Sequence, residues 1–228
     1  MGLLGTGMLL TFTEVAPEHE LDFNEWYNRE HIDERVFMPG FRRARRYLAA
    51  DPATRVKYFA SYETGTVQDL CAPEYMKLLG DQSDWSKRVM ARFTHFDRLT
   101  LTCTVDLAHG ISGATGLARF FPPEESRHGL REALRDRVLP ELASRPGMHG
   151  AALLENDLEV VAVGLRAQGK PVPEDLRQEW VVLLDGSTPS IVGAALDAGF
   201  GDDRLADHGV ASSAIDLGRY ALVFGNHR

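Results

Sequence analysis

The amino-acid sequence predicts an α+β fold in which one βαββαβ unit occurs twice. Three observations support this prediction: a βαββαβ order of expected elements over residues 8–107, a short flexible segment after it, and the same order in the remainder. The chain has 228 residues, which suits one large domain or two of about 100 to 110 residues. Apolar residues make up 44% of it, enough for packed cores.

The first half is expected to open with a strand at residues 8–15. An amphipathic helix follows over residues 21–37, with Asp22 as its N-cap, Glu25 in the capping-box position and Pro39-Gly40 as its stop. The other expected elements are strands at residues 41–49, 56–63 and 96–107, and a second helical region that opens at "TGTVQDL", breaks near residues 80–83 and ends near residue 93.

Residues 108–116, "AHGISGATG", form the predicted linker, because small and flexible residues mark a domain boundary. The second half is expected to contain strands at residues 116–121, within 144–157, at 179–184 and at 213–224, helices at 125–142 and 188–198, and an exposed loop at 166–178. Pro39-Gly40-Phe41 and Pro146-Gly147-Met148 lie 107 residues apart, and each closes the first helix of its half. This repetition indicates a duplication.

The βαββαβ order is that of the ferredoxin-like unit, a four-stranded antiparallel sheet with helices on one face. The bare face of such a sheet needs a partner, and a tandem chain supplies one covalently. We therefore predict two tandem ferredoxin-like repeats, residues 1–108 and 114–228, that form a pseudodimeric α+β barrel. The first repeat is expected to hold the site, and the second to be degenerate and structural.

The charge and cysteine content narrow the range of partners. A net charge of −8 argues against a nucleic-acid binder, and the apolar N-terminal stretch is too short to cross a membrane and has no positive region before it. Cys71 and Cys103 form no disulfide framework or metal-type CxxC pair, which favours a reduced, cytoplasmic protein. No HExxH spacing, phosphate-binding loop or dinucleotide motif is present, so we expect no metal and no cofactor.

The segment "FNEWYNREHIDERVFMPGFRRARRY" concentrates aromatic, histidine and charged side chains at one corner of the first repeat. It resembles the W-Y-x-x-E-H-x-x-x-R and P-G-F-x-x-A-R-R-Y pattern of the EthD-like group in the dimeric α/β-barrel superfamily, and the likeness covers about residues 5–107. Asp33 departs from the proline that many relatives carry there. The resemblance implies a barrel fold. It also implies one of several activities: cofactor-free oxygenase, cyclase, isomerase or dehydratase chemistry on aromatic or polyketide-like molecules, or haem binding.

Helical spacing brings the side chains of this corner close together. We expect His31 to act as general base or acid, because an imidazole titrates near neutral pH, with Glu30 as its orienting carboxylate and Tyr27 as a hydroxyl donor. Trp26 is expected to provide a flat apolar wall, although packing alone would also explain it. A structural network of Glu30, His31 and Arg35 at the helix end is the alternative.

The expected strands carry rows of mixed polarity. Threonines alternate with apolar side chains on the first and fourth strands of the first half, and we expect the mixed rows to line the barrel interior or the junction of the repeats, where they would form a ligand cavity. A solvent-facing sheet side is the alternative. The second strand carries Arg43 and Arg45 on one face and Arg42 and Arg46 on the other. Inward-facing arginines need internal acids or an anionic ligand, so Arg35, Arg43 and Arg45 are candidate substrate-binding residues.

These observations predict a small-molecule enzyme without metal or nucleotide cofactor. It would transfer protons on an aromatic or polyketide-like acid, as a lyase, isomerase, cyclase or cofactor-free oxygenase. The expected partners are a small aromatic or anionic ligand and a second copy of the chain in a homodimer. Two alternatives stay open at this point: a non-catalytic binding or assembly module, and a haem-binding α/β-barrel protein, since one histidine can hold a haem.

Overall fold

A computed structural model describes residues 2–167 and 169–228. The first half contains the strands β1 (Gly7–Val15), β2 (Phe41–Ala49), β3 (Tyr58–Thr64) and β4 (Phe93–Asp106), and the helical segments α1 (Glu20–Trp26), a π-helical turn (Tyr27–His31), α2 (Ile32–Val36), a 3-10 turn (Val67–Cys71), α3 (Pro73–Gly80) and α4 (Asp84–Met90). The second half contains β5 (Ala114–Phe120), β6 (Met148–Asn156), β7 (Trp180–Gly186) and β8 (Asp216–His227), and the segments α5 (Arg127–Ala133), a second π-helical turn (Leu134–Val138), α6 (Leu139–Ala143), α7 (Leu158–Ala167) and α8 (Pro189–Phe200).

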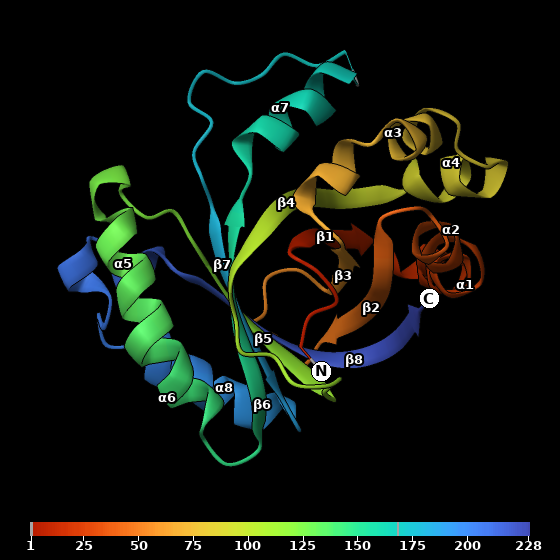
Figure 1. Ribbon diagram of the computed structural model, residues 1–228. Helices are drawn as coiled ribbons and strands as arrows, with labels where there is room; N and C mark the ends of the chain where they lie inside the picture. The colour runs from red at the N-terminus through yellow and green to blue at the C-terminus, as the bar shows by residue number, and fades with distance from the viewer. Residues whose placement is uncertain (1, 168) are drawn as a thin grey trace.

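Across the described residues, eight antiparallel strands close into a barrel in the order β1-β3-β2-β8-β5-β7-β6-β4. The first half contributes the order β4-β1-β3-β2 and the second half the matching order β8-β5-β7-β6, and the two sheets join where β2 pairs with β8 and β4 with β6. The helices lie outside, with α1 to α4 on one side and α5, α6 and α8 on another (Figure 1). The predicted fold, two ferredoxin-like units in a pseudodimeric barrel, is confirmed.

The two halves share local details as well as topology. Each first helix contains a π-helical turn, and the two turns, Tyr27–His31 and Leu134–Val138, lie 107 residues apart. Gly40 and Gly147 lie in the turns that lead from these helices into β2 and β6, with φ of 87° and 81°, a left-handed conformation that glycine adopts without steric cost. The predicted Pro-Gly stops therefore act through the same backbone turn in both halves.

Two local predictions were wrong. The first helix begins at Glu20 rather than at an Asp22 cap; Asp22 instead accepts hydrogen bonds from Trp85 Nε1 at 2.9 Å and Arg92 Nη1 at 2.9 Å. The sequence analysis also missed helix α7, whose valine-rich segment follows β6 directly. No helix within the described ranges is long and apolar enough to cross a membrane.

The barrel interior is filled by side chains rather than by a ligand cavity. The apolar rows of β1 and β4, such as Met8, Leu10 and Leu101, belong to this interior core, while Thr11 on the mixed row lies under the helices. The expectation that the mixed rows line the interior is thus wrong for β1 and β4. On β3, Phe59 belongs to the interior core. Inward-facing leucine and aromatic side chains fill the interior better than threonines would, because a closed barrel of eight strands has room only for side chains.

One end of the interior holds a buried ionic network. Glu63 accepts hydrogen bonds from Arg43 Nε at 2.7 Å, Arg43 Nη2 at 2.9 Å and Arg45 Nη2 at 3.2 Å. Arg45 Nη1 also donates to Asp185 of β7 at 3.3 Å, and Thr115 donates to the same carboxylate. Internal acids therefore neutralise Arg43 and Arg45, and the network joins the two halves.

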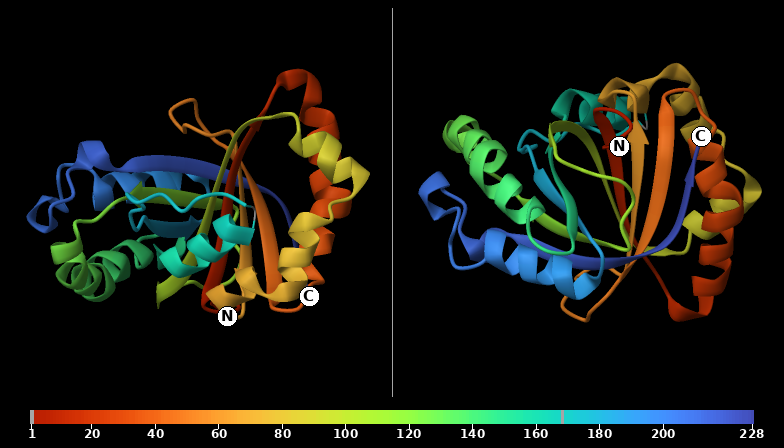
Figure 2. Two further views of the ribbon diagram at one scale, coloured as in Figure 1. Left: turned by 90° about the horizontal axis from the view of Figure 1, so that it is seen from above. Right: turned by 60° about the horizontal axis from the view of Figure 1, so that its bottom comes forward.

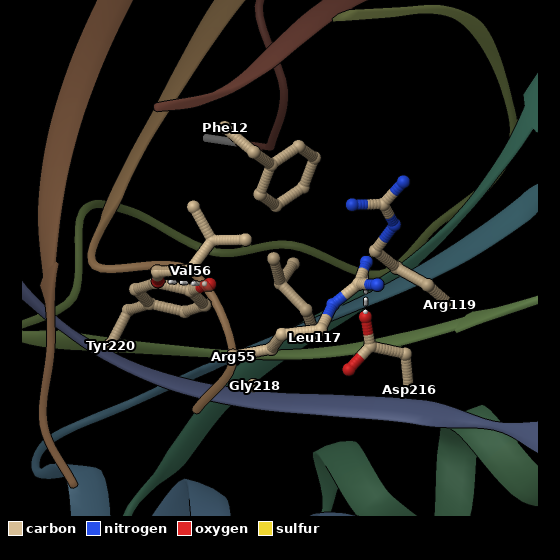
Figure 3. A pocket seen from close by; sticks show the side chains of 8 residues that line it. All are labelled: Phe12, Arg55, Val56, Leu117, Arg119, Asp216, Gly218 and Tyr220. Carbon is tan, nitrogen blue, oxygen red and sulfur yellow. Dashed lines mark hydrogen bonds and ion pairs between the residues drawn. The ribbon is translucent and has the colours of Figure 1, made fainter. Parts of the chain in front are cut away.

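The other end is closed by a second polar cluster (Figure 3). Arg119 of β5 donates to Asp97 of β4 at 2.6 Å and stacks over Phe12, with 4.2 Å between guanidinium carbon and ring centre. Tyr220 donates to the Val56 carbonyl at 3.0 Å. The space left between these groups is about 10 Å³, which is barely enough to hold a single water.

Glu63→Ala is predicted to lower the free energy of unfolding by about 3 to 5 kcal/mol, because it leaves two buried guanidinium groups without their shared carboxylate. Urea unfolding at neutral pH measures this change. Glu25→Ala is the matched control, since Glu25 pairs with Arg29 on the surface, where an ion pair contributes less than about 1 kcal/mol. Equal losses in the two variants would contradict a stabilising role for the network.

Candidate functional site

The predicted corner lies over the outer face of the first sheet. Phe23 and Trp26 are buried on the sheet side of α1, and the π-helical turn brings His31 to the same side. A π turn accommodates one extra residue, so positions five apart come together. Trp26 and His31 have ring centres 4.3 Å apart, and the Tyr27 and His31 ring centres are 5.0 Å apart.

A cavity of about 200 Å³ opens between these helices and the sheet. We call it the His31 pocket; the first helix and the strands contribute Trp26, Tyr27, His31, Arg35, Leu9, Thr11, Tyr62, Phe93, Phe96 and Arg98, and the second helical region contributes Tyr75, Leu79, Gln82 and Met90. Aromatic rings form a large share of its wall, and hydroxyl, imidazole, amide and guanidinium groups face it, a combination that is typical of sites for small organic molecules.

Four buried polar atoms around this pocket lack a well-formed hydrogen bond within the described chain: His31 Nδ1, Tyr62 OH, Thr11 Oγ1 and Gln82 Oε1. Buried polar atoms in proteins are almost always hydrogen-bonded. The Tyr62 hydroxyl lies near that of Tyr27, whose proximity contributes to its raised pKa, but the geometry between them is poor. Convergence of four such atoms on one cavity is the signature of a ligand or water site.

Electrostatics fix the protonation states of the two central groups. Burial lowers the pKa of His31 well below its usual 6.5, and the positive charges of Arg35 and Arg46 lower it further. Burial, together with Tyr27, raises the pKa of Tyr62 well above 10. At neutral pH the pocket therefore presents a neutral imidazole and a protonated phenol, which favours a base rather than an acid role for His31.

Glu30 does not orient His31. Its carboxylate accepts hydrogen bonds from the Ser83 hydroxyl and from the Ser86 hydroxyl at 3.2 Å, and Ser86 in turn accepts from Trp26 Nε1 at 3.0 Å. Ser83 also caps α4 by accepting from the Ser86 backbone N–H. Glu30 thus ties α4 to the first helix, and these hydrogen bonds favour a structural role over the predicted catalytic one.

The structure separates the predicted arginines. Arg35 lines the pocket, 3% exposed, with Nη1 at 3.3 Å from Glu34. Arg43 and Arg45 point into the barrel on the opposite face of the sheet, where Glu63 and Asp185 hold them, so they cannot bind the same ligand as His31. Their predicted substrate-binding role stays a prediction. The alternative of internal pairing accounts for both.

Sequence reasoning missed several residues of the pocket. Thr11, Tyr62 and Arg98 lie on the outer rows of β1, β3 and β4, and Gln82 lies in the connection between α3 and α4. The alternation of threonines with apolar residues on β1 and β4 was a usable signal for the first and third of these. It was assigned to the wrong face of the sheet.

In the described part of the second half, no pocket like the one at His31 lies between the first helix and the sheet. The positions 107 residues after Tyr27, His31 and Arg35 are Leu134, Val138 and Leu142, and all three are buried in its apolar core. The π-helical turn is thus a feature of the scaffold, and the side chains placed on it decide whether a pocket forms.

Haem does not fit the pocket. A cavity of about 150 Å³ accommodates a benzene molecule, and the His31 pocket at about 200 Å³ is only slightly larger. A porphyrin contains four pyrrole rings, so it would have to displace the aromatic walls. The predicted haem alternative therefore has no suitable space beside His31.

Comparison with known proteins identifies the fold. No known family description matches the sequence, and no curated protein matches it. Among solved structures, an anthrone oxidase-like protein aligns with a TM-score of 0.65 at 12% identity, covering 97% of this chain and 92% of the other. A candidate monooxygenase from Lactobacillus acidophilus NCFM aligns with a TM-score of 0.61 at 10% identity, covering 97% of this chain and 96% of the other. A chlorite dismutase variant from Candidatus Nitrospira defluvii aligns with a TM-score of 0.57 at 10% identity, covering 95% of this chain and 92% of the other.

The chain has the fold of the dimeric α+β barrels. At 8 to 12% identity, likeness of this kind establishes the fold and its pseudodimeric arrangement, and it carries no residue-level role. The functional argument therefore depends on the pocket itself.

Stability should depend on pH through His31. Its pKa in the folded chain lies below the unfolded value of about 6.5, so the unfolded state binds more protons as the pH falls below 6.5, and the free energy of unfolding decreases by up to about 1.4 kcal/mol per pH unit. Above pH 6.5, His31 no longer makes the free energy of unfolding depend on pH. Urea unfolding between pH 7.5 and pH 5 should show a shallower dependence in His31→Gln than in the wild type.

His128→Gln is the control, because the His128 side chain is 84% exposed and should leave the dependence as it is in the wild type. An unchanged slope in His31→Gln would show that His31 is not the titrating group.

Proposed function

We propose that this chain is a cofactor-independent enzyme that moves a proton on a small aromatic acid or enol bound in the His31 pocket. The single observation that carries the proposal is the convergence of His31 Nδ1, Tyr62 OH, Thr11 Oγ1 and Gln82 Oε1, all buried and lacking good partners, on one aromatic-walled cavity. A ligand bearing a hydroxyl or carbonyl group would satisfy these atoms. The volume of about 200 Å³ suits one or two aromatic rings.

The proposed chemistry follows from the protonation states. In the tautomer with its proton on Nε2, His31 offers the Nδ1 lone pair to an acidic O–H or C–H of the substrate, and the electron pair left behind becomes an enolate or phenolate. The protonated Tyr62 hydroxyl donates a hydrogen bond to that developing oxyanion. Because a weakly basic imidazole removes only acidic protons, the substrate must be a phenol, an enol or an activated methylene compound.

The resemblance of residues 23–47 to the EthD-like group supports this class of substrate. The fold neighbours named as an anthrone oxidase-like protein and a candidate monooxygenase suggest that the enolate or phenolate reacts onward with oxygen. A lyase, isomerase or cyclase would use the same first step.

A binding protein without catalysis is the second candidate, because His31 lacks the carboxylate partner that usually raises the basicity of a catalytic imidazole. The surface expected for an assembly module is not free, since the inner faces of both sheets are closed within the barrel.

Proton transfer can be tested before the full reaction is known. Phenolic acids and one- or two-ring aromatic enols, incubated with the protein in D₂O, should gain deuterium at carbon faster than in buffer, with mass spectrometry as the readout and an oxygen electrode reporting any oxidation. His31→Gln should reduce exchange at least about a hundredfold, the lower range for loss of a general base. Glu30→Gln should lower the melting temperature while exchange per folded molecule is retained. Ligand binding without exchange would support the binding protein instead.

The pH dependence of exchange gives a further prediction. Because the pKa of His31 is held well below 6.5, kcat/KM for a substrate that does not itself titrate in this range should stay level from pH 8 down through pH 6.5 and decline only at lower pH. Initial rates across pH 4.5 to 8.5 measure this. A decline centred at pH 6.5 would contradict a buried, neutral His31 as the base.

A further inference from the structure

Helix α7 crosses from the second half onto the first. It begins directly after β6, where the Asp157 backbone N–H donates to the Thr100 carbonyl of β4 at 2.9 Å, and Asp157 Oδ1 accepts from the Val160 N–H at 3.0 Å. Val160 is 5% exposed and belongs to the same apolar cluster as Trp26 and Tyr75 of the first half. Both views of Figure 2 place α7 beside the 3-10 turn and α3 of the first half.

The first half has no equivalent of this helix. Its β2–β3 connection spans only residues 50–57, whereas the corresponding β6–β7 connection spans residues 157–179 and includes α7. The α7 helix is therefore an addition to the second half that packs behind the pocket of the first.

Arg98 stands between α7 and the His31 pocket. It lines the pocket, and its Nη2 makes one long hydrogen bond of 3.4 Å to the Tyr75 hydroxyl. Within residues 2–167 and 169–228 no carboxylate pairs with it, in contrast to Arg35, which has Glu34. An arginine that lines an aromatic pocket without a counter-ion is suited to a carboxylate or phenolate ligand.

Gly164 of α7 lies directly beside this guanidinium. Gly164 is buried, and a Cβ atom added to it would lie 3.9 Å from Arg98 Nη1. Glycine is unfavourable inside a helix, and here it keeps the α7 surface beside Arg98 free of any side chain. A longer side chain at this position would enter the space that the Arg98 head group occupies.

We infer that Arg98 is the anion anchor of the His31 pocket and that Gly164 of α7 is its positioning residue, so the second half sets the charge preference of a site whose walls belong to the first. This inference rests on the proposed function only in requiring that the pocket bind small aromatics. The ligand would place its carboxylate or phenolate oxygen at Arg98 and its reacting group toward His31.

The test uses two probes of one shape, 2-naphthoate and the neutral 2-naphthamide, titrated into the full chain by ligand-observed NMR. The wild type should bind the naphthoate about tenfold to a hundredfold more tightly, the range expected for a charge-assisted hydrogen bond. Arg98→Gln should remove this preference while naphthamide binding persists, and Arg98→Lys should restore part of it. Gly164→Leu should also reduce the preference, although Arg98 is intact.

Val163→Leu is the matched control, because Val163 is 41% exposed on the same helix and its enlargement should leave the preference unchanged. Naphthamide binding in each variant reports an intact pocket. Equal affinity of the wild type for both probes would overturn the anchor and leave the proposed function standing, whereas binding of neither would overturn both. Loss of preference in Arg98→Gln but not in Gly164→Leu would overturn the role of α7.

Discussion

The rest of the structure depends on ion pairs that join the two halves inside the barrel. Arg45 of β2 reaches Asp185 of β7 at one end, and Arg119 of β5 reaches Asp97 of β4 at the other. Arg45, Asp185 and Arg119 are buried and Asp97 is partly exposed, and a buried charge is tolerated only with a partner in place. Together with the apolar rows between them they fix how the two four-stranded sheets face each other, so the barrel closes in one register.

A filled barrel determines where a ligand site can be. Because side chains fill the interior between the two ionic clusters, the cavity beside His31 forms outside, between a sheet and its covering helices. Both halves place a π-helical turn there, but the second half packs it with leucine and valine, while the first carries rings and polar groups that leave about 200 Å³ open. One scaffold thus yields an apolar core in one half and a candidate site in the other.

Much of this architecture was predictable, because strand alternation, Pro-Gly stops and the repeated element order are local signals. Trp26, Tyr27, His31 and Arg35 were likewise found by helical spacing and do line the pocket. The face on which each strand row lies was not predictable for β1 and β4, since a barrel interior and a helix-covered face both accept apolar side chains. The pairing of Glu30, Arg43 and Arg45 was not predictable for a different reason: their partners, such as Ser83 and Asp185, lie up to 140 residues away in the sequence.

The inter-half contacts also explain how the second half, whose first helix packs against an apolar core and not against a pocket like that at His31, can matter to function. Helix α7 starts at the end of β6, and β6 lies beside β4 only because the barrel is closed at that junction. Arg98 is on β4, so the distance between α7 and the proposed anion anchor is set by strand pairing across the two halves. A substitution that loosened the β4–β6 pairing would therefore alter ligand charge preference at the His31 pocket without touching any residue that lines it.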